Sequence, residues 1–190
     1  ASACIGLIVL ARLDSVRLPG KALRDIGGTP LIGRVLDRVR RARQPDAVLV
    51  GTSSRAVDDA IARYAAERST PVFRGAADDV AGRCLACADE YGWEGIVRIS
   101  GDSPFIDPEL IDECAATWRQ GGFDLVTNVH PRTWPPGLSV EVIRREALRR
   151  AIGESADPED LEHVTRYFYR RPERFTIRNC AAPRPVGSDV

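Results

Sequence analysis

Residues 4–21, which read C-I-G-L-I-V-L-A-R-L-D-S-V-R-L-P-G-K, contain the two features that decide the fold. The first half is an apolar run without alternation, which is typical of a strand buried on both faces of a parallel sheet. The second half places three cations within ten residues, directly after that run. We therefore expect a core strand over residues 3–11 and, at its carboxyl end, a loop with the chemistry to bind an anion.

The loop has the groups that a polyphosphate requires. Arg12 and Arg17 offer fork-shaped guanidinium donors, Lys21 offers a compact ammonium, and Ser15 and Gly20 can supply a hydroxyl and backbone N–H groups. Lys21 is the single lysine among 27 basic residues. By composition alone, a solvated basic turn is equally compatible. The position after the first strand favours phosphate binding, although neither a Walker A loop nor a G-x-G-x-x-G loop is present.

The rest of the chain alternates short apolar runs with helical patterns, and no internal repeat interrupts it. This pattern predicts a single α/β domain over residues 1–190, with a mostly parallel sheet flanked by helices. Ligands of such sheets bind beyond the carboxyl ends of the strands. The expected strands are 3–11, 47–52, 71–73, 95–100, 124–128, 138–143 and 175–179, and the expected helices are 30–43, 56–67, 79–91, 108–120, 145–152 and 158–170.

An acidic residue follows the expected strand 95–100. Gly101 permits a sharp exit, after which Asp102 projects over the same edge as the basic loop. A carboxylate that faces a triphosphate needs a cation between them, and Mg²⁺ is commonly held by one or two carboxylates together with phosphates. From these residues alone, an aspartate that caps the following turn is the alternative. Arg98, inside the strand, has two open interpretations: a phosphate contact or a partner for a buried acid.

Five segments carry a more specific pattern. They are residues 11–28 (A-R-L-D-S-V-R-L-P-G-K-A-L-R-D-I-G-G), 72–79 (V-F-R-G-A-A-D-D), 97–108 (V-R-I-S-G-D-S-P-F-I-D-P), 132–142 (R-T-W-P-P-G-L-S-V-E-V) and 162–168 (E-H-V-T-R-Y-F). In order and spacing they resemble the cytidylyltransferases that activate acidic sugars. The similarity is greatest to the branch typified by the spore coat polysaccharide biosynthesis protein SpsF. CMP-KDO and CMP-sialic acid synthetases are further relatives.

The resemblance implies a Rossmann-like nucleotide-diphospho-sugar transferase (GT-A-type) fold. It also implies transfer of CMP from CTP to an acidic sugar or related acceptor with release of pyrophosphate, in surface polysaccharide or glycoconjugate biosynthesis. Arg12, Ser15, Arg17 and Lys21 would then hold the CTP phosphates. Asp102 would bind Mg²⁺. With the resemblance, this role is favoured over a cap for the following turn.

Further site residues follow from the same resemblance. Arg74 and Asp79 would lie near the nucleotide, and Arg132, Glu141 and His163 would lie near the sugar acceptor. His163 has an equal alternative as an ordinary helix histidine. Independently, Thr52 ends the second strand, where a small hydroxyl residue can meet the base or ribose; a turn with an N-cap is at least as compatible.

Two departures from the family pattern and two rival functions stay open. Pro136 and Ser139 stand where the branch usually has aspartates, which affects the identity of the acceptor. Relatives also continue with a V-D-T-x-E-D-like segment that supplies a second carboxylate, so we expect this chain to lack the C-terminal end of the domain. A glycosyltransferase would usually show D-x-D, but Pro104 stands two residues after Asp102. A non-catalytic nucleotide-binding domain is the other rival.

Composition excludes several classes of function. The formal net charge is zero, so no bulk field attracts nucleic acid or an anionic membrane. No apolar run approaches the roughly 20 residues that span a bilayer, and we expect a cytoplasmic protein. The five cysteines do not suggest a disulfide framework, and the C-x-x-C pair Cys84 and Cys87 fits a helix packed in the core. A homodimer is expected from the relatives alone.

Overall fold

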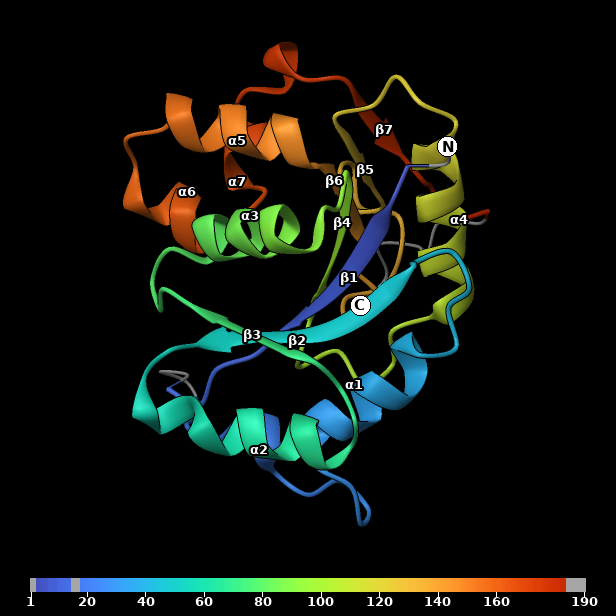
Figure 1. Ribbon diagram of the computed structural model, residues 1–190. Coiled ribbons are helices and arrows are strands. Elements are labelled where there is room, and N and C mark those ends of the chain that lie inside the picture. The colour runs from blue at the N-terminus through green and yellow to red at the C-terminus, as the bar shows by residue number, and fades with distance from the viewer. Residues whose placement is uncertain (1–2, 15–17, 184–190) are drawn as a thin grey trace.

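The computed structural model describes residues 3–14 and 18–183. Within these residues, seven strands form one sheet in the order β3-β2-β1-β4-β6-β5-β7 (Figure 1). Parallel pairing joins β3, β2, β1 and β4, whereas β6 is antiparallel to both of its neighbours. The predicted mostly parallel sheet is therefore confirmed. The strands are β1 (Ile5–Leu10), β2 (Ala47–Ser53), β3 (Val72–Gly75), β4 (Gly95–Ser100), β5 (Leu125–Thr127), β6 (Glu141–Arg144) and β7 (Ile177–Asn179).

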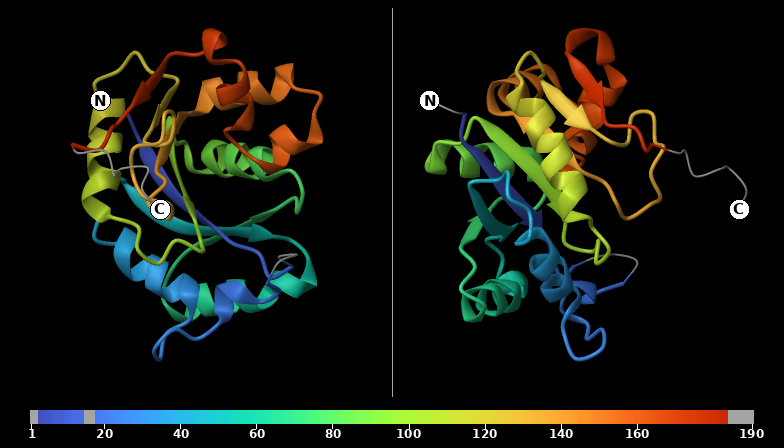
Figure 2. Two further views of the ribbon diagram at one scale, coloured as in Figure 1. Left: turned by 180° about the vertical axis from the view of Figure 1, so that it is seen from behind. Right: turned by 90° about the vertical axis from the view of Figure 1, so that its right-hand side faces the viewer.

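Helices cover both faces of the sheet (Figures 1 and 2). One face is covered by α1 (Leu31–Val39), α2 (Asp59–Glu67) and α4 (Pro108–Arg119). The other face is covered by α3 (Val80–Tyr91), α5 (Arg145–Glu154), α6 (Pro158–Glu162) and α7 (Arg166–Arg170). Three short 3₁₀ helices complete the elements: η1 (Lys21–Leu23), η2 (Ala56–Asp58) and η3 (Pro172–Arg174).

The apolar residues of β1 divide between these two layers. Ile5 and Leu7 pack into the cluster under α1, α2 and α4, and Ile8 packs into the cluster under α3 and α5. All three are fully buried, as the unbroken apolar run predicts. Cys84 and Cys87 are buried free thiols in the second cluster, so their expected packing role is confirmed.

The topology determines where a ligand can bind. The chain leaves β1, passes through α1 and returns as β2 on one side of β1, whereas β4 lies on the other side. Where the chain connections from two adjacent parallel strands run to opposite sides, a crevice forms beyond the carboxyl ends of those strands. The loops after β1 and β4, which contain Lys21 and Asp102, therefore meet at this switch point.

One predicted helix is interrupted. Residues 158–170 form two short helices, α6 and α7, with a break at His163, Val164 and Thr165. The Thr165 hydroxyl donates a 2.7 Å hydrogen bond to the buried carboxylate of Glu141 on β6. This contact between distant segments draws the backbone out of the helical path, which the local apolar pattern does not reveal. No helix among the described residues has the length and apolar character needed to cross a bilayer.

Candidate functional site

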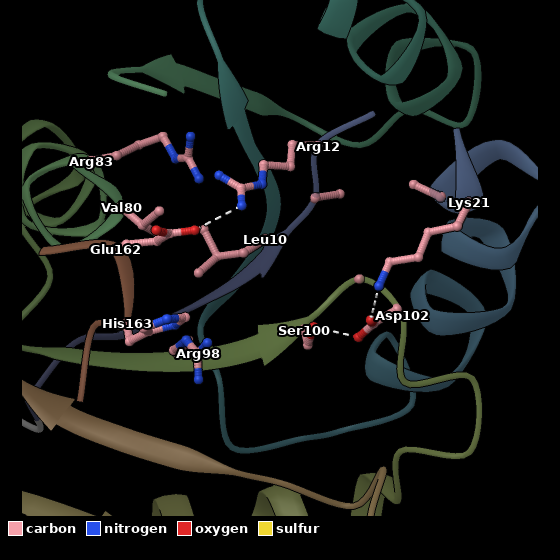
Figure 3. Close-up of a pocket in the computed structure, with 13 residues that line it drawn as sticks. Leu10, Arg12, Lys21, Val80, Arg83, Arg98, Ser100, Asp102, Glu162 and His163 are labelled. Carbon is pink, nitrogen blue, oxygen red and sulfur yellow. Dashed lines mark hydrogen bonds and ion pairs between the residues drawn. The ribbon is translucent and has the colours of Figure 1, made fainter. Parts of the chain in front are cut away.

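A cavity of about 410 Å³ opens at the carboxyl ends of β1 and β4 (Figure 3). Four segments that are distant in sequence form its walls. They are the end of β1 with the following loop (Leu10, Ala11, Arg12, Lys21, Ala22), the first turn of α3 (Val80, Arg83), β4 with its loop (Arg98, Ser100, Gly101, Asp102) and the end of α6 (Glu162, His163). The cavity thus lies at the switch point of the sheet and collects arginine, lysine and carboxylate side chains.

Lys21 and Asp102 meet at one side of this cavity. Lys21 Nζ lies 2.5 Å from Asp102 Oδ2, and Ser100 Oγ donates to Asp102 Oδ1 at 2.5 Å. Burial raises the pKa of the Asp102 carboxyl, but the hydrogen bonds from Lys21 and Ser100 outweigh it, so this pKa lies below its usual value. Asp102 is therefore held as a carboxylate that points into the cavity (Figure 3).

Two glycines bring these side chains together. The Gly101 N–H donates to the Leu10 carbonyl at 2.8 Å, and a Cβ at Gly101 would lie 2.8 Å from that same oxygen. Only glycine permits this approach of the β4 exit to the β1 exit. Gly20 has φ +72°, a conformation that favours glycine, and it directly precedes Lys21. Both Lys21 and Asp102 thus depend on a neighbouring glycine for their position.

Arg12 lies at the other side of the cavity. Its Nη2 donates to Glu162 Oε1 at 2.8 Å, and its Nε lies 3.5 Å from Asp14 Oδ1. All three side chains are about one third exposed, so these surface ion pairs contribute little to stability. An incoming oxyanion can replace Glu162 as the partner of Arg12. Ser15 and Arg17, which were predicted as further phosphate contacts, lie outside the described residues.

Arg98 and Glu141 form the polar bridge between β4 and β6. Arg98 Nη1 lies 2.5 Å from Glu141 Oε2, and the other carboxylate oxygen accepts from Thr165 and Tyr169 at 2.7 Å each. Burial raises the pKa of Glu141, yet the charge of Arg98 and the two hydroxyl groups bring it below its usual value. Arg98 thus pairs with a buried acid and also lines the cavity. Glu141, predicted near the acceptor, is 3 % exposed, and its carboxylate is used within the protein.

The other predicted contacts lie away from the 410 Å³ cavity, and their ligand roles stay predictions. Arg74 donates to the Ser53 and Arg55 carbonyls and pairs with Asp59 at 2.7 Å. Asp79 caps α3 by accepting from the Gly82 N–H at 2.7 Å. The remaining two are Thr52, whose buried Oγ1 has no hydrogen-bond partner, and Arg132, which donates to Ser139 Oγ at 3.1 Å.

Sequence reasoning missed two charged residues of the cavity wall, Arg83 and Glu162. Arg83 lies one helical turn after Asp79, the N-cap of α3. This spacing could have indicated that Arg83 lies at the same end of the helix as Asp79. Glu162 directly precedes His163, so it stood inside a segment already connected with the acceptor. His163 lines the cavity, and the break after α6 places it there. Its contact with the acceptor stays a prediction.

The site fits a magnesium ion that is shared with phosphates. Among residues 3–14 and 18–183, no cluster of three or more His, Cys, Asp or Glu side chains forms a closed metal site. Asp102 supplies one ionised carboxylate, oriented by Ser100, at the cavity wall. Mg²⁺ typically takes one or two carboxylates and completes its shell with water and substrate phosphates. Asp102 is therefore the residue that would hold the metal.

A second cavity of about 420 Å³ adjoins the first. Arg98 and His163 line both cavities, and Tyr169 forms part of the second wall. Two further arginines, Arg166 and Arg170, line it, and both pair with Asp160. The arrangement offers two adjoining binding spaces that meet at His163.

Comparison with known proteins agrees with this geometry. A family model described as cytidylyltransferase matches residues 7–182. The chain is 40% identical over 175 residues to 3-deoxy-manno-octulosonate cytidylyltransferase of Geobacter sulfurreducens, covering 90% of this chain and 64% of that protein. It is 29% identical to the spore coat polysaccharide biosynthesis protein SpsF of Bacillus subtilis, covering 93% and 74%. A solved cytidylyltransferase of Leptospira borgpetersenii superposes with a TM-score of 0.92 at 29% identity, covering 97% and 79%.

Proposed function

This chain belongs to the cytidylyltransferase family, and from that premise we propose that it transfers CMP from CTP to an acidic sugar with release of pyrophosphate. The observation that carries the proposal is the convergence of Lys21, Arg12 and Asp102 on one cavity at the switch point of the sheet. Two cations and a carboxylate are the groups that a metal-bound triphosphate needs. The name of the Geobacter relative, a 3-deoxy-manno-octulosonate cytidylyltransferase, supports an acidic sugar as the acceptor.

In the proposed reaction, an oxygen of the acceptor attacks the α-phosphorus of CTP, and the bond to the β-phosphate breaks. Lys21 and Arg12 exchange their present partners, Asp102 and Glu162, for phosphate oxygens. Their charges then neutralise the negative charge that builds on the departing pyrophosphate. Catalysis of this kind depends on positioning and on preorganised electrostatics.

Asp102 holds Mg²⁺ in this proposal, and Ser100 keeps the carboxylate in place through its 2.5 Å hydrogen bond. When bound, the ion supplies additional positive charge to the phosphate oxygens. The lowered pKa of Asp102 supports this role, because the carboxylate stays ionised at neutral pH.

The acceptor occupies the second cavity in our proposal. Arg166 and Arg170 give this space a basic wall, which suits an acidic sugar. His163 stands where the two cavities meet and is the predicted acceptor contact that best fits this geometry. Arg132 lines neither cavity, and its proposed contact with the acceptor would require it to leave Ser139.

The setting of the reaction is also a proposal. The name of the Bacillus relative supports a role in surface polysaccharide or glycoconjugate biosynthesis. We propose that the protein works in the cytoplasm, where CTP is available, and as a homodimer. Sedimentation velocity of the purified protein would test the dimer, and a single monomeric species at micromolar concentration would reject it.

A grid of the four nucleoside triphosphates against acidic sugars, with Mg²⁺ present, tests the function. Pyrophosphate release reports turnover, and ³¹P NMR identifies the phosphodiester of the product. We expect release with CTP and at least one acidic sugar. Release with GTP or UTP alone would reject the cytidine assignment. CTP binding without turnover on any acceptor would support a non-catalytic nucleotide-binding domain, and sugar transfer from a nucleotide sugar would support a glycosyltransferase.

A further inference from the structure

Arg83 is a buried cation without a carboxylate in ion-pair contact among the described residues. It lies in the first turn of α3 and is 3 % exposed. Its Nη1 donates to the Ala76 carbonyl at 2.9 Å, but its Nε is buried without a hydrogen-bond partner. Across the described part of the chain, Arg83 forms no ion pair with an acid. On the same cavity, Arg12 pairs with Glu162 and Asp14, and Arg98 pairs with Glu141. A buried unpaired charge of this kind is costly unless a ligand completes it.

The guanidinium group of Arg83 faces the cavity and points toward that of Arg12 (Figure 3). Burial has the largest effect on the pKa of Arg83 and lowers it. The negative charge of Asp58 raises this pKa, and the nearby positive charge of Arg12 lowers it. The two guanidinium groups therefore repel one another. Glu162 accepts from Arg12 at 2.8 Å, whereas Arg83 has no carboxylate in contact among the described residues.

We propose that Arg83 contacts an oxyanion of the nucleotide triphosphate, in the β- and γ-phosphate portion that departs as pyrophosphate. The inference rests on the proposed function and adds a phosphate-binding residue on α3, beside Arg12 and across the cavity from Lys21 and Asp102 (Figure 3). Two adjacent guanidinium groups can share the oxygens of one phosphate, and the anion relieves their repulsion. The triphosphate is the favoured source, because Arg83 lines the first cavity and not the second, where we place the acceptor.

A structural role for Arg83 explains only part of its environment. The aliphatic part packs over Gly75, where an added Cβ would lie 3.0 Å from Arg83 Cγ, and Nη1 holds the Ala76 carbonyl. These contacts leave the Nε donor and the charge without a partner. If the role were structural, Arg83→Met would destabilise the ligand-free protein. If the charge serves a ligand, methionine keeps much of the apolar packing and removes an uncompensated charge, so the ligand-free protein keeps its stability.

The test compares Arg83→Met with Arg63→Met, a matched change at an exposed arginine on α2 that does not line the cavity. Calorimetry with Mg²⁺ measures the affinity for CTP and for inorganic pyrophosphate, and thermal unfolding without ligand measures stability. We expect Arg83→Met to lower the affinity for both ligands about tenfold or more. Its melting temperature should be unchanged or higher. We expect Arg63→Met to match the unsubstituted protein.

Three outcomes would overturn the inference. They are unchanged affinity for CTP and pyrophosphate, a clearly lower melting temperature without ligand, and an effect confined to the KM of the acceptor. Arg83→Lys keeps the positive charge but loses the paired N–H donors of the guanidinium group. It provides a second test if Arg83→Met does not fold, and we expect it to weaken the binding of pyrophosphate as well. Pyrophosphate carries no nucleobase. Its binding measurement therefore decides the role of Arg83 even if the protein does not bind CTP and the cytidine assignment fails.

Discussion

Lys21 Nζ and Asp102 Oδ2 lie 2.5 Å apart, although 81 residues separate them in the sequence. The contact exists because β1 and β4 are adjacent parallel strands whose carboxyl ends open onto one cavity. In this arrangement the two charges neutralise one another. Binding of a metal-bound triphosphate would separate them, with Lys21 moving to phosphate and Asp102 to the metal.

The first prediction concerns the ammonium group. Lys21→Ala should lower kcat/KM roughly 10²- to 10³-fold, the range for loss of one preorganised electrostatic contact. The melting temperature should change little, because the Lys21–Asp102 pair is partly exposed. The pyrophosphate assay measures the first effect, and Arg24→Ala, at an exposed residue on the same loop, is the control. Near-normal turnover by Lys21→Ala would refute the assigned role.

The second prediction concerns the metal. Asp102→Asn removes the charge but keeps the shape, so it should raise the Mg²⁺ concentration needed for half-maximal turnover and lower the maximal rate. A chelator should abolish turnover of the unsubstituted protein and leave its melting temperature unchanged, because the described residues form no closed metal site. Equal Mg²⁺ titration curves for both proteins would contradict a metal-binding role for Asp102.

The third prediction concerns the buried pair Arg98 and Glu141. Glu141→Gln leaves the charge of Arg98 without its partner and should cost about 3–5 kcal/mol of unfolding free energy at pH 7. Urea denaturation measures this loss. A cost below about 1 kcal/mol would mean that the pair contributes little.

The same pair predicts a dependence of stability on pH. The pKa of Glu141 is lower in the folded than in the unfolded protein. The stability that it contributes is therefore present above the unfolded value of about 4.3 and is lost as the pH falls through the folded value. Unfolding free energies measured from pH 6 down to pH 3.5 should fall less steeply for Glu141→Gln than for the unsubstituted protein. Parallel curves would refute the assignment.

The fourth prediction concerns the contact between the two loops. In Gly101→Ala the new Cβ would lie 2.8 Å from the Leu10 carbonyl, so the loops must separate. We expect a loss of about 1–3 kcal/mol in stability together with reduced turnover, since Asp102 moves with the loop. Gly153→Ala is the control: nothing lies within 4 Å of its Cβ, and alanine should stabilise α5 by up to about 1 kcal/mol. Equal behaviour of the two variants would contradict the steric argument.

The sequence predicted the features that depend on local pattern. The strand over residues 95–100 begins and ends where expected, because its apolar run stops at Gly101. The meeting of Lys21 and Asp102 followed from the rule for carboxyl ends of parallel strands, and the structure brings them into contact. The family resemblance, carried by residues in five segments, agrees with the family model over residues 7–182.

The features that sequence reasoning missed depend on contacts between distant segments. The predicted helix over residues 158–170 breaks because Thr165 reaches Glu141, which is 24 positions earlier in the chain. Glu141 was assigned to the acceptor from the family resemblance, a role that stays a prediction, and its partnership with Arg98 is invisible in either segment. Arg83 was missed because its burial without an acidic partner is a property of the packed structure.

A crystal structure with a non-hydrolysable CTP analogue and Mn²⁺, located by its anomalous signal, tests the central claim most directly. We expect the metal on the Asp102 carboxylate, phosphate oxygens on Arg12 and Lys21, and an open Lys21–Asp102 pair. A triphosphate bound elsewhere, or a metal held by other residues while Lys21 stays on Asp102, would contradict it.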